Sequence, residues 1–192
     1  ICLILARKGS KRIKNKNLVK INGKPLIEYT LNAIINIMPL NNIFISTNDQ
    51  KIIQIAKKFK INFIKRPENL CKDKSSSEEG IIHGIKLIKR ERKVDHIIFL
   101  QATSPLRDST DIIKCIKKYK KKKLDSIFSA FLAKRFIWTK SRKLSSLTFN
   151  YKKRQRSQNL KTLIIENGAI FIFNFKKFLR FKNRIFGKFD FY

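Results

Sequence analysis

Acidic residues are scarce in this chain: 13 Asp and Glu stand against 45 Lys and Arg, a formal net charge of +32 over 192 residues. So large a charge raises the question of nucleic-acid binding. The basic residues are scattered through nearly every expected helix and loop, however, and dense runs occur only at 117–123 and 152–156. The pattern favours sequence bias and solubility over nucleic-acid binding as the main function, so nucleic acid is not an expected partner.

Cysteine and long apolar runs are also scarce. The three cysteines are odd in number, far apart and without paired metal-ligand spacing, so neither a disulfide framework nor a zinc site is indicated. No apolar stretch reaches transmembrane length, and the first apolar run is too short for a secretory signal. These absences predict a cytoplasmic protein with no membrane partner.

The chain contains no internal repeat and no low-complexity linker, and its 43% hydrophobic content is enough for one substantial core. We therefore expect a single domain over 1–192. Residues 131–163 are polar, basic and irregular, and we interpret them as an excursion from that domain.

Short apolar runs alternate with amphipathic segments along the rest of the chain. Strands are expected at 1–5, 42–46, 61–64, 97–100, 126–130, 164–165 and 169–173, and helices at 25–35, 49–58, 78–90 and 109–119. This alternation predicts an α/β fold with a mostly parallel sheet and helices on both faces.

A basic loop follows the first expected strand. Arg7, Lys11 and Lys16 surround Gly9 at the carboxyl edge of the sheet, where ligands bind in open α/β folds. Gly9 lets the backbone approach a ligand closely, and successive N–H groups in such a turn form an anion-binding concavity. The sequence therefore predicts a nucleotide phosphate site near its N-terminus.

Six blocks of sequence, taken in order, resemble the acylneuraminate cytidylyltransferases, or CMP-N-acetylneuraminic acid synthetases. The blocks are 6–13 with 16–18, 23–27, 46–49, 66–67 with Leu70, 100–107, and 166–171. The first and fifth are specific, and together the blocks cover almost the whole chain. The resemblance implies a three-layer, Rossmann-like nucleotidyltransferase fold and a homodimer, with 131–163 as the dimerisation segment. The implied reaction transfers CMP from CTP to the anomeric hydroxyl of a nonulosonic acid and releases pyrophosphate.

The basic loop suits this reaction. In-line attack on the α-phosphate builds charge on the leaving pyrophosphate, which fixed cations and N–H groups stabilise. We expect Arg7 and Lys16 to be catalytic, and Ser10 and Lys11 to bind CTP. The resemblance implies that Asn17 also contacts the nucleotide.

Arg66 and Ser77 are implied near the cytosine and ribose. Each has a second interpretation that the sequence leaves open. Arg66 precedes a turn proline and would serve equally as a surface cation. Ser75–Ser77 form a good helix N-cap region, a role compatible with ligand binding.

The segment after the fourth expected strand reaches the same sheet edge as the basic loop. Its amide and hydroxyl groups suit a polyhydroxylated sugar, so Gln101, Thr103 and Ser104 are candidate acceptor contacts. Arg107 is expected either to bind an acidic group of the substrate or to form a structural salt bridge.

Two further acceptor contacts are less well defined. Asn167 with Gly168 is either a hairpin turn between two strands or, by the resemblance, a sugar contact. Arg154 resembles the arginine that can pair with the sugar carboxylate. The block at 100–107 resembles the sialic and legionaminic branches of the family more than the pseudaminic or ketodeoxyoctonate branches. The sequence does not narrow the choice of acceptor further.

Mg²⁺ is the expected cofactor by resemblance, but no metal ligand is assigned. The family's Asp-x-Asp element, thought to hold that metal, would lie beyond Tyr192, so we interpret the chain as C-terminally truncated. Asp49 and Asp73 are possible metal ligands in its place, but nothing in their spacing favours that role. The alternatives to an enzyme are a non-catalytic nucleotide-binding remnant and a basic nucleic-acid-binding domain.

Overall fold

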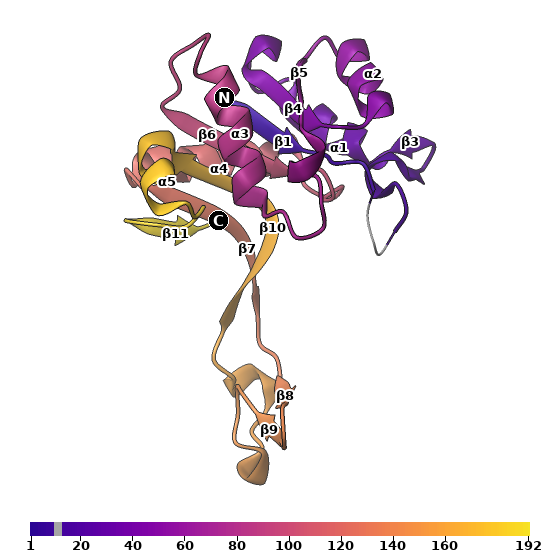
Figure 1. Cartoon of the computed structure of the whole chain (residues 1–192). Helices are drawn as coiled ribbons and strands as arrows, with labels where there is room; N and C mark the ends of the chain where they lie inside the picture. The colour runs from indigo at the N-terminus through magenta and orange to yellow at the C-terminus, as the bar shows by residue number, and fades with distance from the viewer. Residues whose placement is uncertain (10–12) are drawn as a thin grey trace. The chain divides into compact units, whose positions relative to one another are not determined.

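The computed structural model describes residues 1–9 and 13–192 (Figure 1). The chain divides into two compact units. Unit 1 comprises Ile1–Ser129 and Gly168–Tyr192, and unit 2 comprises Ala130–Asn167. Unit 2 nearly coincides with the irregular stretch 131–163, whereas the single-domain organisation stays a prediction.

A seven-stranded sheet in the order β11-β7-β10-β6-β1-β4-β5 forms the centre of unit 1 among the described residues. The strands are β1 Cys2–Leu5, β4 Ile43–Thr47, β5 Asn62–Lys65, β6 His96–Gln101, β7 Ser126–Ala133, β10 Leu163–Asn174 and β11 Phe189–Phe191. β1 pairs in parallel with β4 and β6, as do β4 with β5 and β7 with β11, whereas β10 runs antiparallel to β6. The expected mostly parallel sheet is confirmed.

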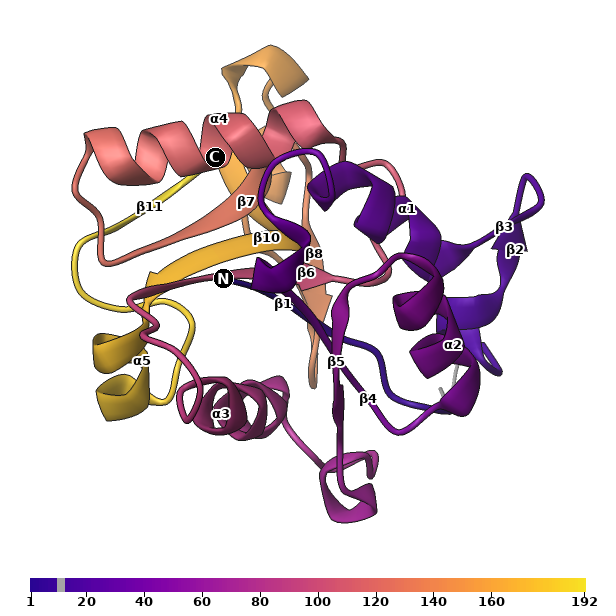
Figure 2. The ribbon, with the colours of Figure 1, turned by 90° about the horizontal axis from the view of Figure 1, so that it is seen from above.

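Helices cover both faces of this sheet (Figure 2). They are α1 Leu26–Ile34, α2 Gln50–Lys58, α3 Ser77–Ile88, α4 Ser109–Lys121 and α5 Phe175–Phe181. One apolar cluster joins α1, α2 and α4 to Ile4, and the other joins α3 and α5 to Leu3. Neighbouring residues of a strand point to opposite faces, so β1 is buried on both sides, as its continuous apolar sequence predicted.

Several shorter elements complete the chain. β2 Lys20–Ile21 and β3 Lys24–Pro25 pair as a hairpin, and the 3₁₀ helices are η1 Lys16–Leu18, η2 Leu40–Asn42, η3 Glu68–Leu70, η4 Tyr151–Lys153 and η5 Ser157–Asn159. Asn22 and Gly23 connect β2 to β3, both with positive φ (46° and 78°). Such φ values match the tight turn that right-twisted hairpin strands prefer.

The hairpin alternative at Asn167 and Gly168 is wrong. β10 runs without interruption from Leu163 to Asn174, and Gly168 lies within it with a φ of 72°. Asn-Gly also suits a distortion inside one strand, because Gly takes positive φ without steric cost. α5 and β11 were not predicted, because closely spaced Phe and Lys at 173–182 hide the helical period.

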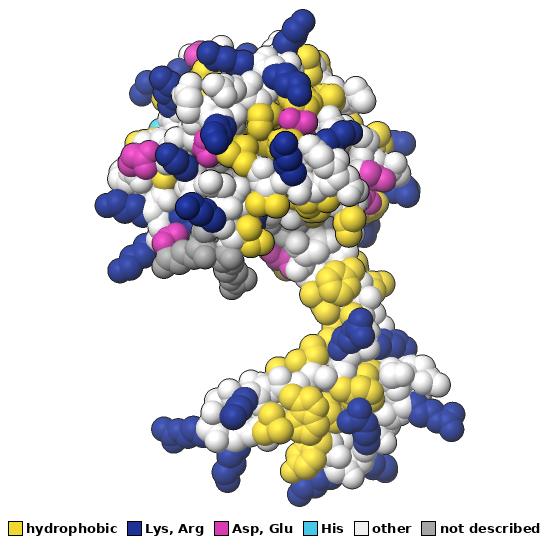
Figure 3. Space-filling model, turned by 90° about the vertical axis from the view of Figure 1, so that its right-hand side faces the viewer, with side chains coloured by type: hydrophobic (Ala, Val, Ile, Leu, Met, Phe, Trp, Pro, Cys, Tyr) yellow, Lys and Arg dark blue, Asp and Glu magenta, His cyan; other side chains and the backbone are white. Residues whose placement is uncertain are grey.

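Unit 2 contains a short antiparallel pair and an aromatic cluster. β8 Trp138–Lys140 pairs with β9 Leu144–Ser146. Phe136 and Trp138 both pack edge-on against Phe149, with ring centroids 4.8 and 5.1 Å apart. Large apolar side chains nevertheless remain exposed on this unit: Phe131, Leu132, Trp138, Leu144, Leu147, Tyr151 and Ile164. Figure 3 shows apolar side chains gathered on its surface. A unit of fewer than about 40 residues rarely forms a self-sufficient core.

Lys and Arg side chains are scattered over the face shown in Figure 3 and do not form one basic patch there. This distribution agrees with the interpretation of the charge as a general surface property. In the described part of the chain, no helix combines the length and the apolar character that crossing a membrane requires.

Asp49 is the N-cap of α2 and is buried, with its Oδ1 accepting a hydrogen bond from the Lys51 backbone N–H at 2.9 Å. We predict that Asp49→Ala lowers the free energy of unfolding by about 1 kcal/mol, whereas Asp49→Asn keeps most of it, because Asn caps equally well. Urea unfolding of both variants measures the difference. Equal loss in the two variants would mean that the carboxylate charge, and not capping, is what matters at this position.

Candidate active site

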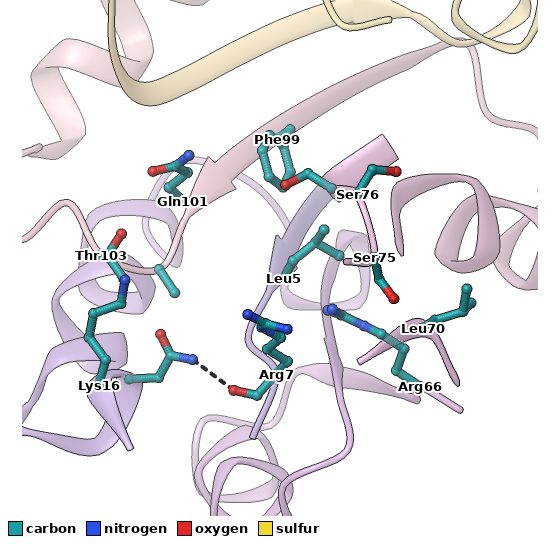
Figure 4. A pocket seen from close by; sticks show the side chains of 13 residues that line it. Leu5, Arg7, Lys16, Arg66, Leu70, Ser75, Ser76, Phe99, Gln101 and Thr103 are labelled. Carbon is teal, nitrogen blue, oxygen red and sulfur yellow. Dashed lines mark hydrogen bonds between the residues drawn. The ribbon is translucent and has the colours of Figure 1, made fainter. Parts of the chain in front are cut away.

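A cavity of about 280 Å³ opens in unit 1 at the carboxyl ends of β1 and β6 (Figure 4). Its lining brings together segments that are far apart in sequence: Leu5, Arg7, Lys16, Asn17, Arg66, Leu70, Ser75, Ser76, Ser77, Phe99, Gln101, Ala102 and Thr103. Seven of these are predicted site residues: Arg7, Lys16, Asn17, Arg66, Ser77, Gln101 and Thr103. Among the described lining residues three are cations and none is acidic, so the cavity is chemically suited to an anion.

Arg7 is held in place by the segment that precedes α3. Its Nη1 donates to the Cys71 carbonyl at 2.8 Å, and its Nη2 donates to Asp73 Oδ1 at 2.9 Å. The Arg7 carbonyl in turn accepts a hydrogen bond from Asn17 Nδ2 at 3.2 Å, drawn in Figure 4. Asn17 therefore has a structural role in the loop, and the guanidinium of Arg7 is oriented at the cavity.

Arg66 is buried, so its interpretation as a surface cation is wrong. Its Nε donates to Ser46 Oγ at 3.0 Å and its Nη2 to the Ser46 carbonyl at 2.5 Å. A Cβ on Gly80 would lie 3.0 Å from Leu5 Cδ1, a tight contact, and at an ordinary contact distance of 3.6 Å from Arg66 Nη1, so glycine at this position mainly leaves room for Leu5.

Desolvation lowers the pKa of Arg66. No carboxylate among the described residues forms an ion pair with it. A buried cation held only by a hydroxyl and a carbonyl gains from an anionic or carbonyl ligand in the adjoining cavity.

The N-terminus of α3 also faces the cavity. Ser76 caps the helix: its Oγ accepts from the Glu79 N–H at 3.2 Å, and the Glu79 carboxylate accepts from the Ser76 N–H at 2.8 Å. Ser75 and Ser77 flank this cap and line the cavity. The capping interpretation is confirmed, and the partial positive charge of the helix end adds to that of the cations.

Arg107 does not line the described cavity. It is buried, and its Nη1 donates to the carbonyls of Gln101 at 3.1 Å and Ala169 at 2.8 Å. Burial lowers its pKa to about 10. The sequence predicted a substrate acid or a salt bridge, but the bonds of Arg107 go to backbone carbonyls, because the chain turns after Gln101 and directs the side chain back under the strand ends. Ser104 likewise lies outside the cavity lining.

The remaining predicted residues lie elsewhere. Arg154 and Asn167 belong to unit 2, where the guanidinium of Arg154 stacks 4.0 Å from the ring centroid of Phe136. Ser10 and Lys11 lie outside the described residues. Phe99 and Ser76 also line the cavity, but the sequence analysis did not identify them as site residues. Their positions, near the carboxyl end of β6 and at the start of α3, could have indicated that they lie at this edge of the sheet.

Residues 1–9 and 13–192 contain no group of three or more His, Cys, Asp or Glu able to hold a metal ion. Both substitutes considered from the sequence have other roles, since Asp49 caps α2 and Asp73 binds Arg7. The described side chains therefore do not fit a protein-built magnesium cage. The three cysteines are buried and free, which agrees with the absence of a disulfide framework.

Solved structures with a similar fold include a CMP:2-keto-3-deoxy-manno-octonic acid synthetase complexed with CTP. It matches with a TM-score of 0.67 and 16% identity, over 94% of this chain and 76% of that one. A 4-diphosphocytidyl-2C-methyl-D-erythritol synthase from Anaerococcus prevotii matches with a TM-score of 0.64 and 12% identity, over 94% and 74% of the two chains. These similarities show that the chain has a nucleotidyltransferase-like α/β fold.

A family model described as cytidylyltransferase matches residues 1–187, and the chain belongs to that family. It is 32% identical to an N-acylneuraminate cytidylyltransferase of Escherichia coli, over 99% of this chain and 45% of that protein. It is 33% identical to a pseudaminic acid cytidylyltransferase of Campylobacter jejuni, over 68% of this chain and 57% of that protein. The chain thus spans about half the length of these relatives, and the family predicted from the sequence is confirmed.

Arg66→Lys tests whether the cavity binds a nucleotide through this guanidinium. A single ammonium cannot hold both Ser46 atoms and also reach the cavity, so we expect about tenfold weaker CTP binding. Thermal unfolding with increasing CTP measures the affinity, since a ligand of the native state raises the midpoint. Arg92→Lys is the matched control, because Arg92 binds Asn41 and Asn42 outside the cavity. Equal affinity in both variants would contradict the assignment.

Proposed function

We propose that this protein transfers CMP from CTP to the anomeric hydroxyl of a nonulosonic acid and releases pyrophosphate. The observation that carries the proposal is the cavity itself, in which Arg7, Lys16 and Arg66 converge on a space whose described lining contains no acidic residue. The names of the relatives from Escherichia coli and Campylobacter jejuni supply the cytidylyl donor and the class of acceptor.

The phosphates of CTP occupy the Arg7 and Lys16 end of the cavity. Charge moves onto the pyrophosphate as the bond to the α-phosphorus breaks, and fixed cations stabilise the charge without reorganising at that moment. Arg7 is already oriented by Cys71 and Asp73, so little entropy is lost when a phosphate oxygen binds its remaining N–H groups. Ser10 and Lys11 are proposed to add contacts to the same phosphates.

The cytosine and ribose lie toward Arg66 and Ser77. The buried guanidinium of Arg66 donates well to a carbonyl such as that of cytosine, and the start of α3 offers hydroxyl and N–H donors. Asn17 completes the nucleotide side of the cavity, where it also holds the Arg7 carbonyl.

The acceptor sugar lies toward Gln101 and Thr103, whose amide and hydroxyl can both donate to and accept from sugar hydroxyls. Ser104, Asn167 and Arg154 are further proposed acceptor contacts, with Arg154 pairing with the sugar carboxylate. Arg107 acts on the same end only through the backbone carbonyls that it binds.

Mg²⁺ is proposed as the cofactor of the nucleotide, where it would neutralise phosphate charge. The lining residues of the described cavity are cations, amides, hydroxyls and apolar groups. The contribution assigned to this chain is therefore to bind and orient the two substrates and to stabilise the charge on the leaving pyrophosphate. A cytoplasmic location remains a prediction.

The first test is CMP-sugar formation by this chain with CTP, Mg²⁺ and a panel of sialic, legionaminic, pseudaminic and ketodeoxyoctonic acids. Product with one acid is expected and identifies the acceptor. Arg7→Ala should lower kcat roughly 10- to 100-fold, because a charge-assisted hydrogen bond is worth about 1.5–3 kcal/mol. Arg90 is an exposed arginine in the turn after α3, so Arg90→Ala should match the wild type. No product from folded protein that still binds CTP would favour a non-catalytic nucleotide-binding chain.

We also propose that the protein is a homodimer and that unit 2 supplies contacts to the second copy. The exposed apolar side chains of unit 2 support this, since a small unit cannot bury them by itself. Phe131, Phe136 and Trp138 are the aromatic residues proposed to pack at that interface.

Leu147 is 66% exposed, so Leu147→Lys should weaken self-association and leave the fold intact. Sedimentation velocity over a concentration series measures the shift toward monomer. Leu106→Lys is the control, because Leu106 is 96% exposed on unit 1. A monomeric wild type, or equal effects of the two variants, would contradict the proposed interface.

A further inference from the structure

Gly168 lies against the side chain of Gln101, at the end of the cavity proposed for the sugar. A Cβ built on Gly168 would lie 3.2 Å from both Nε2 and Oε1 of Gln101 and 3.3 Å from its Cδ. Both residues belong to unit 1. With a side chain at 168, the amide of Gln101 would therefore have to move by a few tenths of an ångström.

The backbone on both sides of this contact is fixed. The Gln101 carbonyl accepts hydrogen bonds from Thr30 Oγ1 at 3.3 Å and from Arg107 Nη1 at 3.1 Å. The same Nη1 donates at 2.8 Å to the carbonyl of Ala169, the residue after Gly168. Arg107 thus ties the end of β6 to β10, so steric pressure at position 168 falls on the Gln101 side chain.

The backbone of Gly168 has a φ of 72°, a conformation in which side chains are strained. Gly23 provides a matched comparison within the same chain. Its φ is 78°, and a Cβ there would meet no atom within 4 Å. A side chain would strain the backbone at both positions, but only at Gly168 would it meet Gln101. Comparing variants at the two positions therefore distinguishes backbone strain from an effect on Gln101.

We propose that Gly168 is a positioning residue: its missing side chain and left-handed backbone seat the amide of Gln101 so that it faces the acceptor sugar. Gly168 itself touches no substrate. It acts only through Gln101, whose amide lies against Gly168 and whose side chain lines the cavity, as labelled in Figure 4. The kinetic consequences rest on the proposed function, whereas the placement of the amide does not.

The structural part is tested by NMR on ¹⁵N-labelled protein. The side-chain amide signals of Gln101 are assigned by their absence from Gln101→Ala. They should shift in Gly168→Ala and stay unchanged in Gly23→Ala. Unshifted signals in Gly168→Ala would overturn the proposal whatever reaction the protein catalyses.

The functional part is a double-mutant cycle measured with CTP and the accepted sugar. Gly168→Ala should raise KM for the sugar about tenfold and leave KM for CTP unchanged, and Gly23→Ala should change neither. Because both changes act on one amide, the double variant Gly168→Ala with Gln101→Ala should be no worse than Gln101→Ala alone. Multiplying effects would show that position 168 acts through another group and would overturn the assignment. A shift of the amide signals in a protein that forms no CMP-sugar would support the placement and refute only the proposed function.

Discussion

The register between β1 and its two parallel neighbours is the constraint on which the site depends. Leu5 pairs with Ser46 of β4 on one side and with Gln101 of β6 on the other. These three residues form one row across the sheet. Ser46 binds Arg66, Leu5 lines the cavity, and Gln101 is the proposed sugar contact. A shift of one residue in either strand would turn these side chains to the opposite face.

Buried charge in and near the cavity has a cost for the folded state. Arg66 and Arg107 are both buried, and desolvation lowers the pKa of each. Hydrogen bonds to carbonyls offset part of that penalty, but neither guanidinium has an ion-pair partner among the described carboxylates. Arg66 lines the cavity, so a bound anion can offset the rest of its desolvation penalty. Substrate binding and stability are therefore coupled at this residue.

The sequence was most informative where a chemical signal coincided with the end of a strand. The basic residues after β1 and the polar residues after β6 had to meet at one edge, because parallel strands end there together. Arg107 shows the limit of this reasoning: its position in the motif was clear, but side-chain direction after a turn depends on long-range packing. Asn167 and Gly168 show another limit, since the same dipeptide serves a hairpin or a distorted strand.

Arg107 joins the antiparallel strand β10 to the parallel strand β6 beside the site. β10 runs antiparallel to β6, which places the carbonyl of Ala169 within reach of the same nitrogen that binds the carbonyl of Gln101. A guanidinium with a pKa of about 10 stays protonated at neutral pH, so both bonds are charge-assisted. Both bonds come from Nη1, whereas Nε and Nη2 are buried and find no hydrogen-bond partner among the described residues. Arg107 therefore ties the end of β6 to β10 through a single nitrogen beside the residue that lines the cavity, Gln101.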